Sequence, residues 1–112
     1  MTPRFVIRPA AEADVLEAAT WYESRAPGLG LDFVGAVERC LDDIHAAPQR
    51  FPRVHAEVRR ALLRRYPYGV FYVVAADAIE VIACLHCRRD PKRWQRRLWA
   101  CRRTRSCCRP AG

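Results

Sequence analysis

The residue types best suited to chemistry are gathered towards the C-terminal end of the chain. After Leu85 the sequence continues as His86-Cys87-Arg88-Arg89-Asp90-Pro91-Lys92-Arg93-Trp94. A histidine can exchange a proton near neutral pH, and arginine side chains can bind phosphate or carboxylate groups. We therefore expect the functional surface of the protein to include this segment.

Positive charge is concentrated in the same part of the sequence. The whole chain of 112 residues has a formal net charge of +8. From Arg88 onward ten basic residues stand against Asp90 alone, a net of +9, so residues 1–87 carry a net of −1. A near-neutral domain with a cationic C-terminal segment favours nucleic acid or an acidic protein surface as partner. A solvated tail that aids solubility is the plain alternative.

Six cysteines raise the question of disulfide bonds or a metal site. The sequence has no secretory signal and the cysteines have no repeating frame, so we expect reduced thiols. Cys84-Leu-His-Cys87 has the spacing of half a zinc site. However, Cys84 lies in an apolar run typical of a strand, and no second spaced pair follows. We therefore predict neither a metal site nor a cofactor.

The length and hydropathy of the chain limit its organisation. At 112 residues the chain fits one hydrophobic core, because domains of this size cannot divide their buried surface between two. No stretch approaches the roughly 18 apolar residues that cross a bilayer. We expect a cytoplasmic protein with a single domain at residues 1–98, followed by a basic extension rich in Cys and Arg at residues 99–112, for which disorder is one interpretation.

Hydrophobic periodicity predicts the elements that position the C-terminal groups. The expected elements are a strand at Phe5–Ile7, helices over Ala11–Arg25 and from about Phe33 to Ala47, and strands at Val58–Leu63, Tyr68–Ala75 and Ala78–Leu85. The short joint Pro27-Gly28-Leu29-Gly30 makes the helices an antiparallel hairpin. The order β-α-α-β-β-β predicts an α+β fold in which this hairpin packs on an antiparallel sheet of about four strands.

Several short motifs follow one another along the chain. They are Trp21-Tyr22-Glu23 with Pro27-Gly28-Leu29-Gly30, Pro48-Gln49-Arg50-Phe51-Pro52, the run from Arg59 to Tyr72, and His86 with Arg88-Arg89-Asp90-Pro91 and Trp94. In this order they resemble the RelE/ParE superfamily of toxins in type II toxin–antitoxin systems, also called plasmid-stabilisation proteins. Together they span about residues 5–97. The resemblance implies the β-α-α-β-β-β fold and a toxic activity.

The RelE branch consists of ribosome-dependent endoribonucleases that cleave messenger RNA. On this interpretation His86 is the acid–base group and Arg88 binds phosphate. Further positive charge would come from Arg60, Arg64 and Arg65. An arginine that many RelE-like members carry in the third strand falls here at Gly69, and His86 is about one residue from the expected register, which would reverse its face of the strand.

The ParE branch is the better match. Its members inhibit DNA gyrase by binding, and endings of the type His-x-Arg-Arg-Asp-Pro-x-x-Trp are common among them. The resemblance therefore implies a target-binding surface composed of Arg88, Arg89, Lys92, Arg93 and Trp94. It also implies a cognate antitoxin that wraps the toxin, and no small-molecule substrate. On this interpretation the protein is not an enzyme.

Structural roles remain open for each of these groups. His86 can pack at a sheet edge, Trp94 can cover the open face of the sheet, and the arginines flanking the predicted strand can protect its edge from aggregation. A degenerate family member that keeps only antitoxin or nucleic-acid binding is a third interpretation.

Overall fold

Both predicted helices form, and local chemistry explains where each begins and ends. The computed structural model describes residues 4–88, which include α1 (Pro9–Arg25) and α2 (Leu29–Ala46). Helix α1 begins two residues earlier than predicted because Pro9 occupies its first turn, where no hydrogen bond is lost and the backbone angle of proline suits a helix. Helix α2 begins at Leu29, four residues before the predicted start at Phe33, and ends just before Ala47 and Pro48, as the sequence predicts.

The joint between the helices is held by Glu23. Its carboxylate accepts hydrogen bonds from the main-chain N–H of Gly28 at 3.0 and 3.1 Å and of Gly30 at 2.9 Å. These bonds satisfy donors at the start of α2 and lower the pKa of Glu23. A side chain at position 30 would lie 2.7 Å from the main-chain oxygen of Ala19, so glycine allows the two helices to approach closely.

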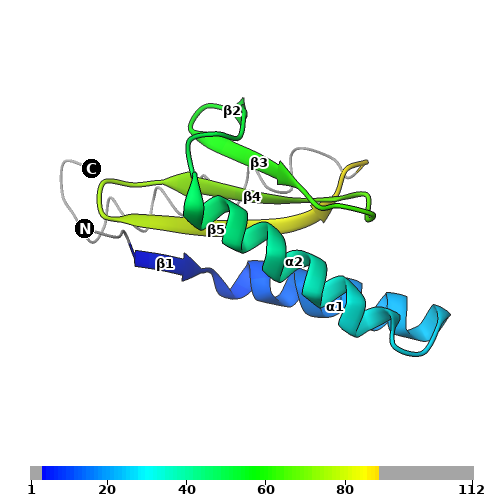
Figure 1. Cartoon of the computed structure of the whole chain (residues 1–112). Helices are drawn as coiled ribbons and strands as arrows, with labels where there is room; N and C mark the ends of the chain where they lie inside the picture. The colour runs from blue at the N-terminus through cyan, green and yellow to red at the C-terminus, as the bar shows by residue number, and fades with distance from the viewer. Residues whose placement is uncertain (1–3, 89–112) are drawn as a thin grey trace.

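The sheet has five strands, in the order β1-β5-β4-β3-β2 (Figure 1). They are β1 (Arg4–Ile7), β2 (Arg53–His55), β3 (Val58–Leu62), β4 (Tyr68–Val74) and β5 (Ala78–His86). The predicted α+β class is confirmed, and so is the order of one strand, two helices and then further strands. Strand β2 is an addition, and β1 pairs with β5 in parallel while the other pairs are antiparallel.

The parallel direction of β1 could not be read from its residues. Arg4 lies opposite Ala78 and Ile7 opposite Val81, so β1 covers only the first part of the β5 edge. Parallel and antiparallel pairing use the same main-chain groups, and a strand of four residues does not distinguish them. The direction follows from where α1 packs, because β1 leads directly into that helix.

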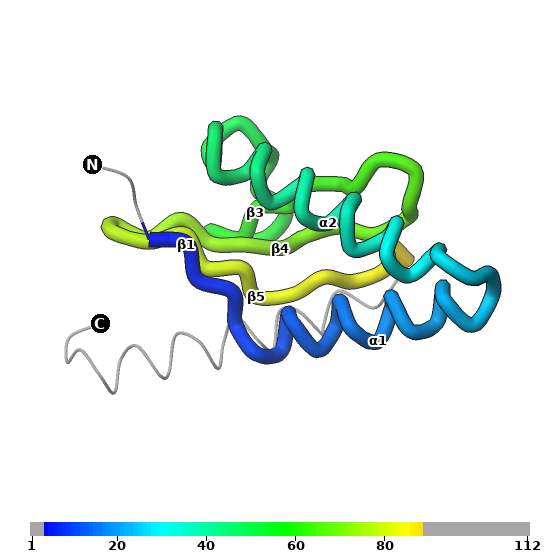
Figure 2. The backbone as a smooth tube through the Cα atoms, turned by 60° about the horizontal axis from the view of Figure 1, so that its bottom comes forward, coloured from blue at the N-terminus to red at the C-terminus, as the bar shows by residue number. Residues whose placement is uncertain are grey.

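Both helices lie on one face of the sheet (Figure 2). On this helix-covered face the buried cluster includes Phe33, Ile44, Val70, Tyr72 and Cys84. The opposite face carries a second buried cluster made of Val58, Phe71, Val73, Ile82, Ala83 and Leu85. Neither helix in residues 4–88 combines the length and the apolarity needed to cross a bilayer.

Candidate functional site

His86 is the last residue of β5 and lies on the helix-covered face. Its partner across the sheet is Tyr68, and the two rings are 5.3 Å apart with an interplanar angle of 72°. The main-chain N–H of Arg88 donates a hydrogen bond of 3.0 Å to Nδ1 of His86. A nitrogen that accepts a hydrogen bond carries no proton, so in the neutral ring the proton is on Nε2.

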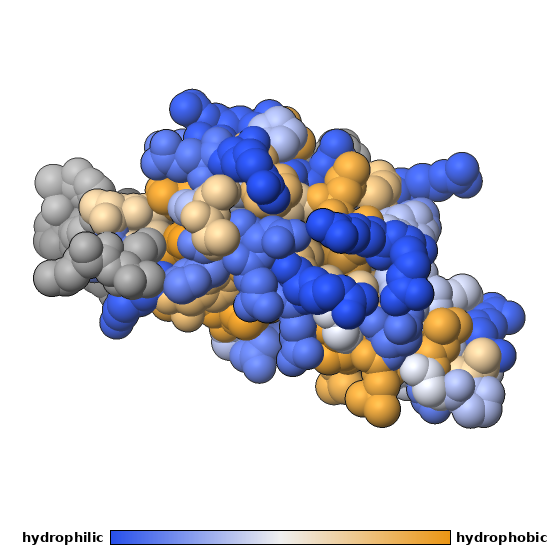
Figure 3. All heavy atoms as spheres, in the orientation of Figure 1, coloured by the Kyte–Doolittle hydropathy of each residue, from blue (hydrophilic) through white to orange (hydrophobic). Residues whose placement is uncertain are grey.

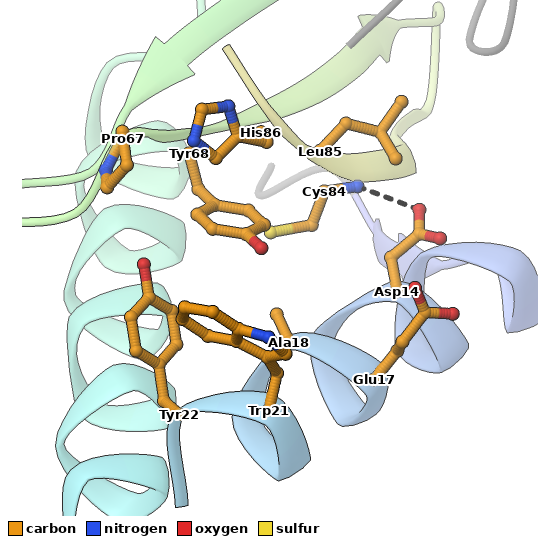
Figure 4. A pocket seen from close by; sticks show the side chains of 10 residues that line it. All are labelled: Asp14, Glu17, Ala18, Trp21, Tyr22, Pro67, Tyr68, Cys84, Leu85 and His86. Carbon is orange, nitrogen blue, oxygen red and sulfur yellow. Dashed lines mark hydrogen bonds between the residues drawn. The ribbon is translucent and has the colours of Figure 1, made fainter. Parts of the chain in front are cut away.

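A cavity of about 570 Å³ opens between α1 and the ends of β4 and β5 (Figure 4). The chemically distinctive side chains that line it are Asp14, Glu17, Trp21, Tyr22, Tyr68 and His86. We call this space the α1 pocket. It combines two carboxylates of one helix with four rings, and none of these residues except His86 is among the predicted site residues.

The walls of the α1 pocket are fixed by packing and by one hydrogen bond. Tyr22 stacks on Phe33 with 5.2 Å between ring centroids, and burial raises the pKa of Tyr22. Trp21 packs edge-on to Tyr22 at 5.0 Å, yet half of its surface is exposed. The carboxylate of Asp14 accepts a 3.1 Å hydrogen bond from the main-chain N–H of Cys84, beyond the point where β1 ends.

Two of the arginines in and after β3 make hydrogen bonds that connect different segments of the fold. The Arg59 guanidinium donates to the main-chain oxygens of Gln49 and Phe51 at 3.1 and 2.6 Å. The Arg65 guanidinium binds both carboxylate oxygens of Asp32 at 3.0 Å. The Tyr66 hydroxyl also donates to Asp32, and this hydrogen bond makes the largest single contribution to lowering the pKa of that carboxyl. These contacts fasten the loops around β3 to the sheet edge and to α2.

Arg60 lies on the face opposite the helices. It is the cross-strand partner of Phe71, and its methylene groups extend over Gly69, where a Cβ would lie 3.0 Å from Arg60 Cγ. Gly69 stands where the resemblance to RelE-like members would place a strand arginine. This position is therefore covered by an arginine from the neighbouring strand. The Nε atom of Arg60 is buried and has no hydrogen-bond partner.

The predicted catalytic residues do not converge in the described part of the chain. His86 and Arg60 lie on opposite faces of the sheet, since their cross-strand partners Tyr68 and Phe71 belong to different clusters. Arg64 is exposed in the loop after β3, and Arg88 is exposed beside His86. Of the predicted target-binding residues, Arg89, Lys92, Arg93 and Trp94 lie outside the described residues, as does the predicted boundary at residue 98.

The two cysteines with zinc-like spacing differ in their surroundings. Cys84 is buried on the helix-covered face, whereas Cys87 is exposed. Burial raises the pKa of the Cys84 thiol to about 12, which disfavours the thiolate that binds metal. Within residues 4–88 no group of three or more His, Cys, Asp or Glu side chains could hold a metal ion.

Both the fold and the sequence are similar to those of known proteins. The structure is similar to a solved structure described as "Chromosomal ParDE TA system from P. aeruginosa", with a TM-score of 0.69, 19% identity, and coverage of 76% of this chain and 96% of that chain. This likeness shows a shared fold. Residues 5–91 match the family described as "ParE toxin of type II toxin-antitoxin system, parDE". The chain therefore belongs to the ParE toxin family.

Curated relatives agree with this assignment. Toxin ParE2 of Mycobacterium tuberculosis strain H37Rv is 30% identical over 95 residues, which cover 81% of this chain and 88% of the relative. Toxin ParE2 of strain CDC 1551 matches to the same extent. The predicted membership of the ParE-like branch is thus confirmed, and the protein is a ParE toxin of a type II toxin–antitoxin system.

Proposed function

We propose that this toxin inhibits DNA gyrase by binding and that a cognate antitoxin neutralises it. The observation that carries the proposal is the separation of His86 and Arg60 on opposite faces of the sheet. An RNA-cleaving site needs its acid–base group and its phosphate-binding cations to meet at one phosphate. A toxin that acts by binding needs only a complementary surface.

The proposed gyrase-binding surface begins at Arg88 and continues through Arg89, Lys92, Arg93 and Trp94. Arg88 is exposed, and its main-chain N–H donates a hydrogen bond to Nδ1 of His86, the last residue of β5. Arginine can pair with acidic side chains of a protein or with DNA phosphates, and tryptophan is a frequent contact anchor. Such a surface would act in the cytoplasm.

A separate apolar surface suits the antitoxin. A groove of about 350 Å³ runs along both helices and includes Val15, Leu16, Val34 and Val37. Leu16 is 69% exposed, and Figure 3 shows apolar side chains at the surface over the helical hairpin. Exposed apolar surface of this kind favours an amphipathic segment of a partner protein. Opposite net charge on the antitoxin would speed its association with the basic toxin.

The proposal is tested with purified protein in a gyrase supercoiling assay. We expect loss of supercoiling activity with the unmodified toxin. Arg88→Ala should weaken the inhibition at least about tenfold, because one central charged contact contributes roughly 1.5–3 kcal/mol. Arg53→Ala is the matched control, since Arg53 is an exposed arginine of β2 at the far edge of the sheet. Added antitoxin should restore supercoiling.

A parallel assay examines the RelE-like alternative. Translating ribosomes with a defined messenger RNA are incubated with the toxin, and cleavage is mapped by primer extension. Unchanged supercoiling at high toxin concentration together with cleaved messenger would refute gyrase inhibition in favour of an endoribonuclease. Inactivity in both assays, with unaffected growth on expression, would favour the degenerate member.

A further inference from the structure

The face of the sheet opposite the helices is buried, although both helices of the described residues lie on the other face (Figure 2). We infer that the apolar run Leu98-Trp99-Ala100-Cys101 of the C-terminal extension packs on this opposite face and forms a third layer of the protein. The run lies outside the described residues. The inference goes beyond gyrase inhibition and does not depend on it.

The burial of the opposite face supplies the first part of the argument. Val58 and Ala83 are completely buried there, and Phe71 is 4% exposed. An antiparallel sheet with one face in water alternates apolar and polar side chains along its strands. Strand β4 instead has an unbroken series of buried residues from Gly69 to Val73. The sheet is therefore covered on both faces.

An irregularity in β5 adds apolar surface to the same face. Phe71 lies opposite Ala83, whereas the next residue of β4, Tyr72, lies opposite Val81. Ile82 is thus the extra residue of a β-bulge, and it belongs to the opposite cluster together with Ala83. Two successive side chains of β5 therefore contribute to one face, which is more apolar than strict alternation would make it.

The described residues do not supply the cover. Within residues 4–88, the loops after α2 and β3 pack on the helix-covered face through Phe51, Leu63 and Tyr66. The partly buried apolar residue that packs against the opposite cluster is Val54 of β2, which belongs to the same sheet. The burial is that of a single chain, so a second copy is not its source. The cover therefore comes from residues 1–3 or 89–112.

The sequence of these segments identifies the part that fits. Residues 1–3 are Met-Thr-Pro, which are too few to cover a cluster of six side chains. In residues 89–112 the run from Leu98 to Cys101 is the longest uninterrupted apolar stretch. Leu98 follows Arg88 by ten positions, which can span about 33 Å when extended, whereas β5 with its nine residues spans about 30 Å. The run can therefore reach every part of the cluster.

The third layer has an edge, and positive charge belongs at that edge. Leu62 lies on the same face of the sheet but is 55% exposed, so the cover does not extend to the end of β3. Pairs of arginines flank the apolar run at positions 96–97 and 102–103. Arginine can pack its methylene groups on apolar surface while its charge stays in water. The layer thus holds these charges on the side of the toxin away from the helical hairpin.

The test is cysteine alkylation of the reduced, full-length toxin, because the run contains its own probe, Cys101. Labelling by iodoacetamide is followed for each cysteine by peptide mass spectrometry. The exposed Cys87 is the accessible reference, and the buried Cys40 is the protected one. We expect Cys101 to react at least about tenfold more slowly than Cys87, because a packed thiol reacts only when the segment opens.

A variant of the run separates this packing from the rest of the fold. Leu98→Asp should release the run, because a carboxylate buried without a partner is costly. Labelling of Cys101 should then approach the rate of Cys87 to within about twofold, while Cys40 stays protected. Ala111→Asp adds the same charge outside the run and is the matched control, which should leave the labelling of Cys101 unchanged.

The position of the run is measured by NMR in toxin with labelled methyl groups. We expect nuclear Overhauser effects between the Trp99 ring, assigned by Trp99→Phe, and the methyl groups of Val73 or Ile82. Rapid labelling of Cys101 in the unmodified toxin would overturn the inference. So would a protected Cys101 without these Overhauser effects, because the run would then be buried elsewhere.

Discussion

The two faces of the sheet carry different chemistry although their residues alternate along the same strands. The helix-covered face brings His86 and Tyr68 towards the carboxylates and aromatic rings of α1. The opposite face carries Arg60 across Gly69, within a largely apolar cluster. Residues that seemed to form one cationic and histidine-containing group are therefore divided between two surfaces. In a sheet, the face on which a residue lies matters as much as its type.

The largest expected effect concerns packing on the helix-covered face. Phe33 is fully buried and its ring contacts those of Tyr22, Tyr66 and Tyr68. Phe33→Ala should lower the free energy of unfolding by about 3–5 kcal/mol. Leu62→Ala, on the opposite face and 55% exposed, should cost less than about 1 kcal/mol. Urea denaturation measures both, and similar costs would contradict the contrast between the faces.

The next expected effect is a loss of stability in alkaline solution. Burial raises the pKa of Tyr72 to about 12, of Cys84 to about 12 and of Cys40 to about 11, and all three belong to the helix-covered cluster. The three groups ionise at lower pH in the unfolded chain than in the folded protein. Their contribution to the stability of the fold is therefore complete below the pKa values of the unfolded chain, and it is lost as the pH rises through the pKa values of the folded state.

Unfolding followed by circular dichroism from pH 8 to pH 12 tests this expectation. The midpoint of the unfolding transition should fall steadily above about pH 9. Tyr72→Phe should reduce the pH dependence, although it also removes the hydrogen bond from the Tyr72 hydroxyl to the main-chain oxygen of Pro48. A variant with an undiminished pH dependence would show that the Tyr72 ionisation does not contribute.

The opposite face yields a smaller effect, which is a coupling between neighbours. A methyl group at position 69 would lie 3.0 Å from Arg60 Cγ and 3.1 Å from Cδ. Gly69→Ala should therefore cost about 1 kcal/mol more in the native background than in an Arg60→Ala background. Urea denaturation of the four proteins of this double-mutant cycle measures the coupling, and additive effects would show that Arg60 moves aside without cost.

The smallest expected effect lies in acid, at the ion pair that ties α2 to the loop after β3. The Tyr66 hydroxyl and then the Arg65 guanidinium lower the pKa of Asp32. This lower pKa stabilises the folded protein at pH values above the pKa of an aspartate in the unfolded chain. The stabilisation is lost as the pH falls through the lower pKa that Asp32 has in the folded state. The difference in unfolding midpoint between pH 6 and pH 3 should be smaller for Asp32→Asn than for the Asp42→Asn control.

Local patterns predicted most of the secondary structure. The end of α2 before Pro48 and the three runs rich in β-branched and aromatic residues each agree with the structure within one or two residues, whereas α2 begins at Leu29, four residues before the predicted start. These signals depend on neighbours three or four positions apart in helices and two apart in strands. Strand β2 was missed because three residues after Pro52 offer too short a pattern.

The sequence by itself determined the family, the order of the elements and the concentration of positive charge after residue 87, because motifs and charge are properties of the chain. Tertiary structure alone decided that β1 runs parallel to β5, that Arg60 covers Gly69, and that Asp14 and Trp21 of α1 share a pocket with Tyr68 and His86. Asp14 and Trp21 are more than forty positions away from Tyr68 and His86 in the sequence. Their meeting depends on how the helical hairpin packs on the sheet, which is set by the whole core and by no single local pattern.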